Sequence, residues 1–251
     1  MALPANEGRD AHTKYIRKVL DGTPYECTKL DQLTGGSVNF VYCGTPRHRR
    51  AATENEPAID YLLVKHSTSH LSCNEDFVLE VSRWNYEKFM LDALNNFKVP
   101  ETENGVLVQT PKLWYANDDA HVSVIEYVCS SINLTYGLTA SDDPALSKGH
   151  ALAVGVALGK WLRAFHDWTS QPAQEALRAH VRQSSAMRDL KFRVEYGIVF
   201  KVLENFPDIL MPHRHVLVEA IDSIQRDMEQ VDKHEHDADL GVIHGDFCTG
   251  K

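Results

Sequence analysis

Short apolar stretches separated by polar turns fill the first half of the chain, and this pattern predicts β-strands. Two of the stretches, at 27–33 and 38–42, flank a Gly-Gly turn, so we expect them to form a β-hairpin. Apolar runs predict three further strands, at 58–65, 112–116 and 121–128.

Helices are predicted where apolar residues recur every three or four positions. The first half of the chain has two such segments, at 10–20 and 74–95. After a polar stretch at 130–144 the pattern is helical: 148–168, then 171–203 as two helices broken at Gly197, then 213–233. Apolar residues cover most of the circumference of 148–168, so we expect this helix at the centre of its lobe.

This order of elements predicts an α+β protein with two lobes. Residues 1–26 form an amino-terminal helix and extension, and residues 27–128 form a small antiparallel sheet with one helix. Residues 129–251 form a mainly helical second lobe.

Composition narrows the class of protein. The 251 residues are 43% hydrophobic and 24% charged, as in soluble globular proteins, and no apolar run approaches the roughly 20 residues that cross a bilayer. The amino terminus is polar and resembles no secretory signal. Five cysteines are scattered without a Cys-x-x-Cys pair, which favours reduced thiols and a cytoplasmic location.

The formal net charge of −9 argues against nucleic-acid binding and is compatible with cationic or neutral small substrates. Two histidine pairs, His213 with His215 and His234 with His236, raise the question of a metal site. They stand at the ends of predicted elements and have no cysteine or ordered carboxylate partners, so we assign no metal ligands.

The hairpin tip and the next strand carry the first candidate chemistry. Gly35, Gly36 and Ser37 form a tip whose backbone N–H groups can cover phosphates, although a plain hairpin turn explains them equally. Lys65 ends the strand at 58–65 and is either a phosphate ligand or a lysine that reaches solvent.

Two acidic residues in the predicted helix at 74–95 are candidate partners for Lys65. Glu80 and Glu87 are seven residues apart, so both fall near one helix face, from which either can form an ion pair with Lys65. The alternative is that both are solvated surface acids.

The last candidate lies near the end of the chain. An apolar run leads into His244, Gly245 and Asp246, and a tight turn fixes the direction of a carboxylate, which suits a catalytic aspartate. A polar turn after a strand is also common in ordinary loops, so this tripeptide does not identify a function by itself.

Three segments in this order resemble the aminoglycoside phosphotransferase family, which is related to choline kinases and has a protein-kinase-like fold. Residues 33–42 are similar to its nucleotide loop, residues 159–166 to its central helix and residues 242–250 to its catalytic loop. The spacing is closest to that of fungal members. The resemblance implies an ATP-dependent kinase that moves the γ-phosphate to a hydroxyl of a small molecule.

The resemblance also implies roles for single residues. The hairpin tip would cover the ATP phosphates, Lys65 would hold the α- and β-phosphates, and Glu87, which fits the family's helix spacing better than Glu80, would orient Lys65. Residues 126–128 would line the adenine pocket through their backbone. The implied nucleotide-binding residues are Gly35, Gly36, Ser37, Asn39, Lys65, Glu87, Glu126, Tyr127 and Val128. Asp246 would accept the proton of the attacking hydroxyl, and His244 would support the loop.

One departure from the family pattern concerns magnesium. The family has an Asn that ligates Mg²⁺ where this chain has Lys251, and the family's second acidic loop has no counterpart here. We therefore expect a carboxy-terminally truncated or inactive version of the kinase, with ATP and Mg²⁺ as the family's cofactors. The alternatives are a non-catalytic nucleotide-binding or regulatory protein, and a structural domain without a nucleotide site. The expected partner is a small hydroxyl compound, with a cationic one favoured by the acidic charge, and neither nucleic acid nor membrane.

Overall fold

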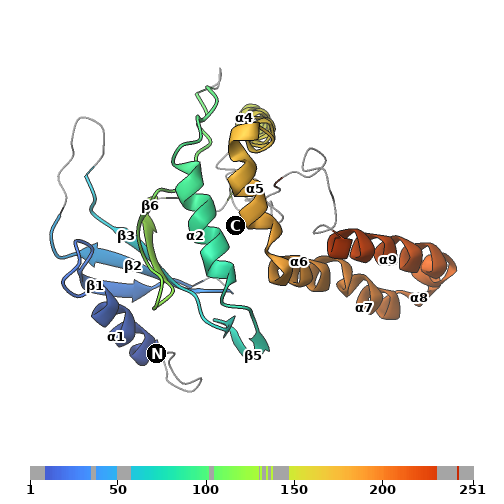
Figure 1. Ribbon diagram of the computed structural model, residues 1–251, viewed down its shortest axis with the longest axis horizontal. Helices are drawn as coiled ribbons and strands as arrows, with labels where there is room; N and C mark the ends of the chain where they lie inside the picture. Colours follow the sequence, from blue (N-terminus) through green and yellow to red (C-terminus); the bar gives the residue numbers. More distant parts are fainter. Residues whose placement is uncertain are drawn as a thin grey trace. The chain divides into compact units, whose positions relative to one another are not determined.

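A computed structural model describes residues 9–34, 38–49, 58–101, 105–129, 131, 134, 137, 147–230 and 242. The chain divides into two compact units, with the division between Leu158 and Gly159, inside helix α4 (Lys148–Thr169). Figure 1 shows the first unit in blue to green, with the first part of α4 in yellow, and the helices that follow α4 in orange to red. The predicted lobe boundary after residue 128 stays a prediction.

The first unit is built on an antiparallel five-stranded sheet in the order β1-β2-β3-β7-β6. Its strands are β1 (Cys27–Gln32), β2 (Phe40–Pro46), β3 (Leu62–His66), β6 (Leu113–Asn117) and β7 (Val122–Glu126). The predicted hairpin is confirmed: β1 pairs with β2, and the Leu33 N–H donates to the Val41 carbonyl at 2.8 Å. With the helices, this sheet confirms the α+β class.

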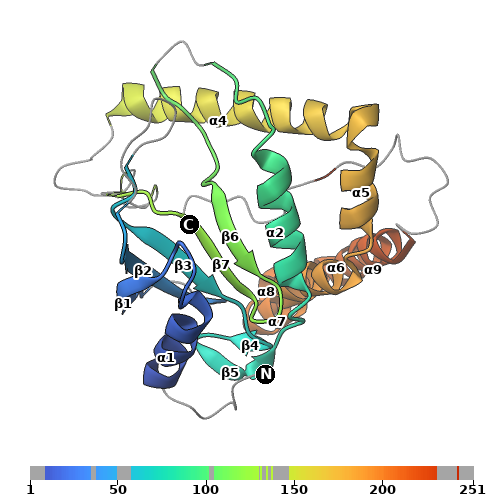
Figure 2. The ribbon, with the colours of Figure 1, turned by 60° about the vertical axis from the view of Figure 1, so that its left-hand side comes forward.

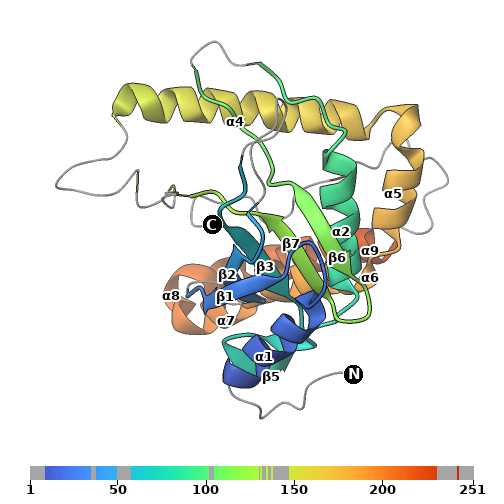
Figure 3. The same cartoon turned by 90° about the vertical axis from the view of Figure 1, so that its left-hand side faces the viewer.

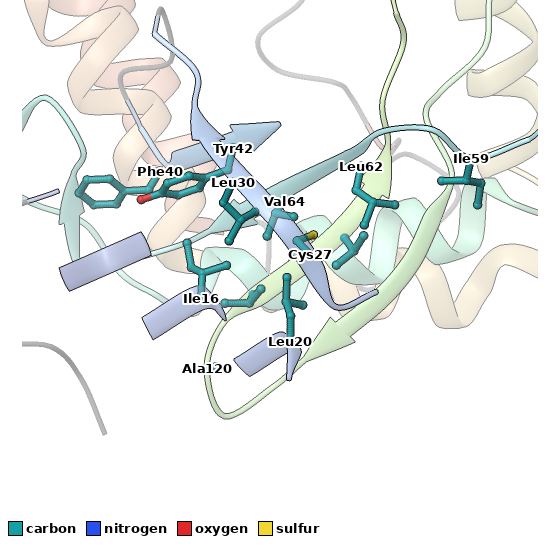
Figure 4. Packing of buried hydrophobic residues seen from close by; sticks show 12 residues of the cluster. Ile16, Leu20, Cys27, Leu30, Phe40, Tyr42, Ile59, Leu62, Val64 and Ala120 are labelled. Carbon is teal, nitrogen blue, oxygen red and sulfur yellow. The ribbon is translucent and has the colours of Figure 1, made fainter. Parts of the chain in front are cut away.

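One face of the sheet is covered by helix α1 (Arg9–Leu20), as Figure 2 shows. In β3 the buried residues are Leu62, Val64 and His66, whereas Leu63 and Lys65 are half-buried. Because strand side chains alternate between faces, the first three belong to the α1 side and the other two to the opposite side. Figure 4 shows the resulting core, in which Ile16 and Leu20 of α1 lie beside the strand side chains.

The helix predicted at 74–95 is wrong in its first part. Residues His70–Leu71 (β4) and Asn74–Val78 (β5) form a small two-stranded sheet, and the helix α2 spans Arg83–Leu94. The Leu79 N–H donates to the Ser69 carbonyl at 2.9 Å, which ties the end of this hairpin back to its start. The cross-strand bonds of β4 and β5 therefore override the helical spacing of the apolar residues, and α2 begins only after Ser82.

The helical part of the chain is more finely divided than predicted. After α4 come η1 (Pro172–Gln174), α5 (Glu175–Arg182), α6 (Ser185–Lys191), the π-helical η2 (Phe192–Tyr196), α7 (Ile198–Asn205), α8 (Pro207–Leu210), η3 (Met211–His213) and α9 (Arg214–Gln230). The predicted break at Gly197 is confirmed, and a second break at Gln183–Ser184 was missed.

Helix α4 is continuous over its whole length (Figure 3). The sequence predicted that apolar residues around this helix place it at the centre of its lobe. Trp161 and Phe165 are buried, but Leu152 is 70% exposed, so the apolar residues of α4 are not all covered. In the described part of the chain no helix is long and apolar enough to cross a lipid bilayer.

A cluster of histidines lies where α1 meets the sheet. The His66 ring lies 5.6 Å from the His12 ring and 5.3 Å from the Tyr15 ring, between centroids. Burial, with neighbouring His12, His121 and His70, lowers the pKa of His66 to about 4. Among the described residues its buried Nδ1 has no hydrogen-bond partner, so His66 is neutral in the folded protein.

This depressed pKa makes stability depend on pH. The unfolded chain binds the His66 proton near pH 6.5 and the folded chain only near pH 4, so stability is lost as pH falls through that window. We expect the free energy of unfolding in urea to drop by about 2 kcal/mol between pH 7.5 and pH 5 through this residue. His66→Leu should remove most of that drop, whereas Gln in place of the exposed His213 should keep it. An unchanged pH slope in His66→Leu would show that His66 is not the responsible group.

Candidate functional site

Lys65 lies on the face of the sheet opposite α1, next to the last residue of β3. The strand extends one residue beyond Lys65, so Lys65 is not the terminal residue that the sequence pattern predicted. Its side chain is 21% exposed, so most of it is covered although it is not fully buried.

Helix α2 brings an acidic side chain to Lys65. Lys65 Nζ donates a hydrogen bond to Glu87 Oε1, in an ion pair between β3 and the second turn of α2. Glu80 precedes the helix, and its Oε2 lies 3.5 Å from Ser82 Oγ. Of the two candidate glutamates, the structure pairs Glu87 with Lys65.

The surroundings of Lys65 form a half-buried, largely apolar strip that the sequence did not reveal. The register places Val41 of β2 and Ser123 of β7 beside Lys65, and Cys43 and Ile125 beside Leu63. Val41, Cys43 and Leu63 are half-buried on the Lys65 face. A strip of this kind beside a cation suits a ligand with a flat apolar part and an anionic part. Only the strand register identifies these residues.

The predicted base-binding segment lies at the end of β7. The Glu126 N–H donates to the Lys112 carbonyl at 2.9 Å, so this group is already used within the sheet. The Tyr127 ring lies 5.9 Å from the Tyr61 ring. Neighbouring Cys43 is the main cause that raises the pKa of Tyr127. Val128 is exposed.

Of the four predicted nucleotide-binding residues in the hairpin loop, the structure describes Asn39. Its Oδ1 accepts hydrogen bonds from Ser67 Oγ at 3.1 Å and from Arg83 Nη2 at 3.0 Å. Arg83 was missed, because an arginine at the start of a helix looks like an ordinary surface cation in the sequence. The other predicted site residues lie outside the described residues: Gly35, Gly36, Ser37, His244 and Asp246.

The described residues do not fit a magnesium site. No group of three His, Cys, Asp or Glu side chains among them is placed to hold a metal ion, and the Glu87 carboxylate is engaged by Lys65. We therefore derive no chemical step through magnesium from this part of the chain.

Comparison with known proteins supports a relationship to phosphotransferases. No protein-family model matches the chain. The chain is similar to phosphotransferase FrzJ of a Cladobotryum species, with 24% identity over 244 residues, which is 92% of this chain. It spans 60% of the length of that relative. The narrower resemblance to aminoglycoside phosphotransferases and choline kinases stays a prediction.

The Lys65–Glu87 pair should contribute little to stability, because both side chains are partly exposed and water screens their attraction. We expect Lys65→Met and Glu87→Gln each to change the free energy of unfolding by less than about 1 kcal/mol. Urea denaturation of the two variants and of the double variant measures this. A loss of several kcal/mol in either single variant would show that the pair is a structural element.

Proposed function

We propose that the unit built on β1–β7 binds ATP and that the chain is the nucleotide-binding part of a phosphotransferase acting on a small hydroxyl compound. The Lys65–Glu87 ion pair, on the half-exposed face of the sheet, is the observation that carries the proposal. An ammonium group is a compact positive charge that suits a phosphate ligand. The Glu87 carboxylate holds the Lys65 ammonium group in place, and a single carboxylate leaves that group able to bind a phosphate as well.

The strip beside Lys65 supports the proposal for the rest of the nucleotide. A purine base can lie on Val41, Cys43 and Leu63, which are half-buried on the Lys65 face. The Glu126 N–H already donates to the Lys112 carbonyl. A base at the end of β7 would therefore accept hydrogen bonds from the backbone N–H groups of Tyr127 and Val128. The hairpin tip, residues 35–37, would cover the phosphates.

The proposed reaction moves the γ-phosphate. Asp246 would accept the proton of the acceptor hydroxyl as its oxygen bonds to the γ-phosphorus, and the bond from that phosphorus to the β,γ-bridging oxygen would break to release ADP. His244 would support the loop. Lys65 would hold the α- and β-phosphates, so its task is to position the nucleotide. The net charge of −9 favours a cationic alcohol as the acceptor.

Nucleotide binding can be tested by calorimetry on the full chain, with ATP and with adenosine, in the presence and absence of Mg²⁺. We expect Lys65→Met and Glu87→Gln to weaken ATP binding by roughly ten-fold or more while adenosine binding is unchanged, because one loses a charge-assisted contact and the other its orientation.

The chain offers a matched control in Lys88 of α2, another lysine paired with a carboxylate, since its Nζ lies 2.6 Å from Asp118 Oδ1. Lys88→Met and Glu80→Gln should bind ATP like the original protein. If ATP does not bind, or if the Lys65 and Lys88 variants lose affinity equally, the nucleotide site is not at Lys65.

Phosphoryl transfer requires a separate test. In a coupled assay for ADP release, run with a panel of hydroxylated amines and neutral alcohols, Asp246→Asn should reduce any turnover by the chain roughly a hundred-fold or more at unchanged ATP affinity. Asp239→Asn, at the start of the same apolar run, is the control and should keep activity. ATP binding without turnover of any acceptor would instead support the non-catalytic nucleotide-binding alternative.

A further inference from the structure

Arg83, the first residue of α2, is a buried cation whose hydrogen bonds leave the helix. Its side chain belongs to a residue only 8% exposed, and Nη1 donates to the Thr68 carbonyl at 2.7 Å and the Glu80 carbonyl at 3.1 Å. Nη2 donates to Asn39 Oδ1 at 3.0 Å. Arg83 thus joins α2 to the chain after β3 and to the residue before β2.

Burial of this guanidinium is unfavourable in itself. Desolvation lowers the pKa of Arg83, and the nearby Glu87 carboxylate offsets part of that effect. A buried charge is retained only where fixed acceptors compensate for its lost hydration, as the two carbonyls and the Asn39 amide do here. The contact with Asn39 bridges 44 positions of sequence, so it defines tertiary structure rather than the local helix start.

Asn39 is held by the end of its amide that cannot donate. A guanidinium has donors only, so the atom that faces Arg83 must be the carbonyl oxygen, and Ser67 Oγ donates to the same oxygen at 3.1 Å. Asn39 directly precedes β2, at the end of the hairpin loop that begins after β1. Two donors therefore fix the Asn39 side chain at the point where the chain enters β2.

Arg83 and Glu87 are four residues apart in α2, so they lie on the same side of the helix. Glu87 binds Lys65 of β3, and Arg83 binds Asn39 at the hairpin. One helix thereby contacts both parts of the sheet to which the proposed function assigns phosphate contacts.

We propose that Arg83 is a positioning residue that fixes Asn39, at the entry to β2, to α2, so that Asn39 and Lys65 keep one separation for the phosphates of a bound nucleotide. The proposal rests on the proposed nucleotide site for its purpose, but the contact between Arg83 and Asn39 exists without ligand. By linkage, a nucleotide that contacts Asn39 also stabilises the position of α2, and a fixed α2 in turn strengthens nucleotide binding.

The first test needs no nucleotide. Hydrogen exchange, followed by mass spectrometry on the full chain, reports on the Leu33 N–H, which bonds to the Val41 carbonyl at the base of the loop. We expect Arg83→Lys, which keeps the charge but loses the planar fork, to speed exchange of the amides at 33–41, read in a peptide that begins at Asp31 or earlier, by roughly ten-fold.

Arg178 provides a matched control. It is 9% exposed, and its guanidinium also donates to two carbonyls, those of Thr169 and Gln171, and to one side chain, that of Glu175. Arg178→Lys should leave exchange at 33–41 unchanged even if both variants lose similar thermal stability. Equal acceleration in both variants, or none in Arg83→Lys, overturns the proposal.

The second test measures the consequence for ligand binding. Arg83→Lys and Asn39→Ala should each weaken ATP binding by roughly ten-fold without changing adenosine affinity. Both substitutions break the same Arg83–Asn39 contact, so the double variant should bind ATP as tightly as the single variant of lower affinity. Additive losses overturn the proposal. If Arg83→Lys does not fold, Asn39→Ala and Ser67→Ala carry the same exchange test.

The two proposals fail in different ways. If the original chain binds no ATP, the proposed function is wrong, while exchange at 33–41 still decides whether Arg83 fixes Asn39. If ATP binds and depends on Lys65 but neither measurement responds to Arg83→Lys, only the positioning role is wrong.

Discussion

The strict alternation of β3 is the constraint on which the first unit depends. Leu62, Val64 and His66 face α1 and are buried, so Lys65 must face the other way. A shift of the register by one residue would place the ammonium group in the apolar core and expose the core residues, which is strongly unfavourable. The hydrophobic core therefore fixes the direction of the lysine before any ligand or partner acts on it.

Helix α2 is held by polar contacts as well as by apolar burial. Its buried residues are Arg83 and Trp84, so a guanidinium and a large apolar side chain both leave water at its start. Polar contacts join it to its surroundings: Arg83 with Asn39 and the Thr68 carbonyl, Glu87 with Lys65, and Lys88 with Asp118. Lys88 also lies over the Trp84 ring, 5.2 Å from its centroid. Polar contacts of this kind specify geometry more than they add stability.

The two faces of the sheet consequently have different physical characters. On the α1 face, apolar side chains surround the buried His66, and protonation of His66 opposes the folded state. On the Lys65 face, half-buried Val41, Cys43 and Leu63 lie next to a partly exposed cation. The proposed ligand site therefore lies on the face of the sheet that does not form the hydrophobic core. The similarity to a phosphotransferase is compatible with that proposal.

Elements with local signals could be predicted from the amino-acid sequence. Alternation and the Gly-Gly turn were enough for the β1–β2 hairpin and for β6 and β7, since these depend on neighbouring residues. Helical spacing also located α1, α4 and α9, and Gly197 marked a helix break. It failed at 74–78, where cross-strand bonds to β4 override the apolar spacing.

The tertiary structure alone decided the contacts between distant residues. Whether Glu80 or Glu87 meets Lys65 depends on where α2 begins, and the chosen pair is 22 residues apart. The Arg83–Asn39 contact, the histidine cluster under α1 and the strip beside Lys65 follow from strand register and helix placement, which no local pattern encodes. Sequence periodicity reports which face of an element is apolar, whereas only the folded chain determines which polar groups from remote elements meet.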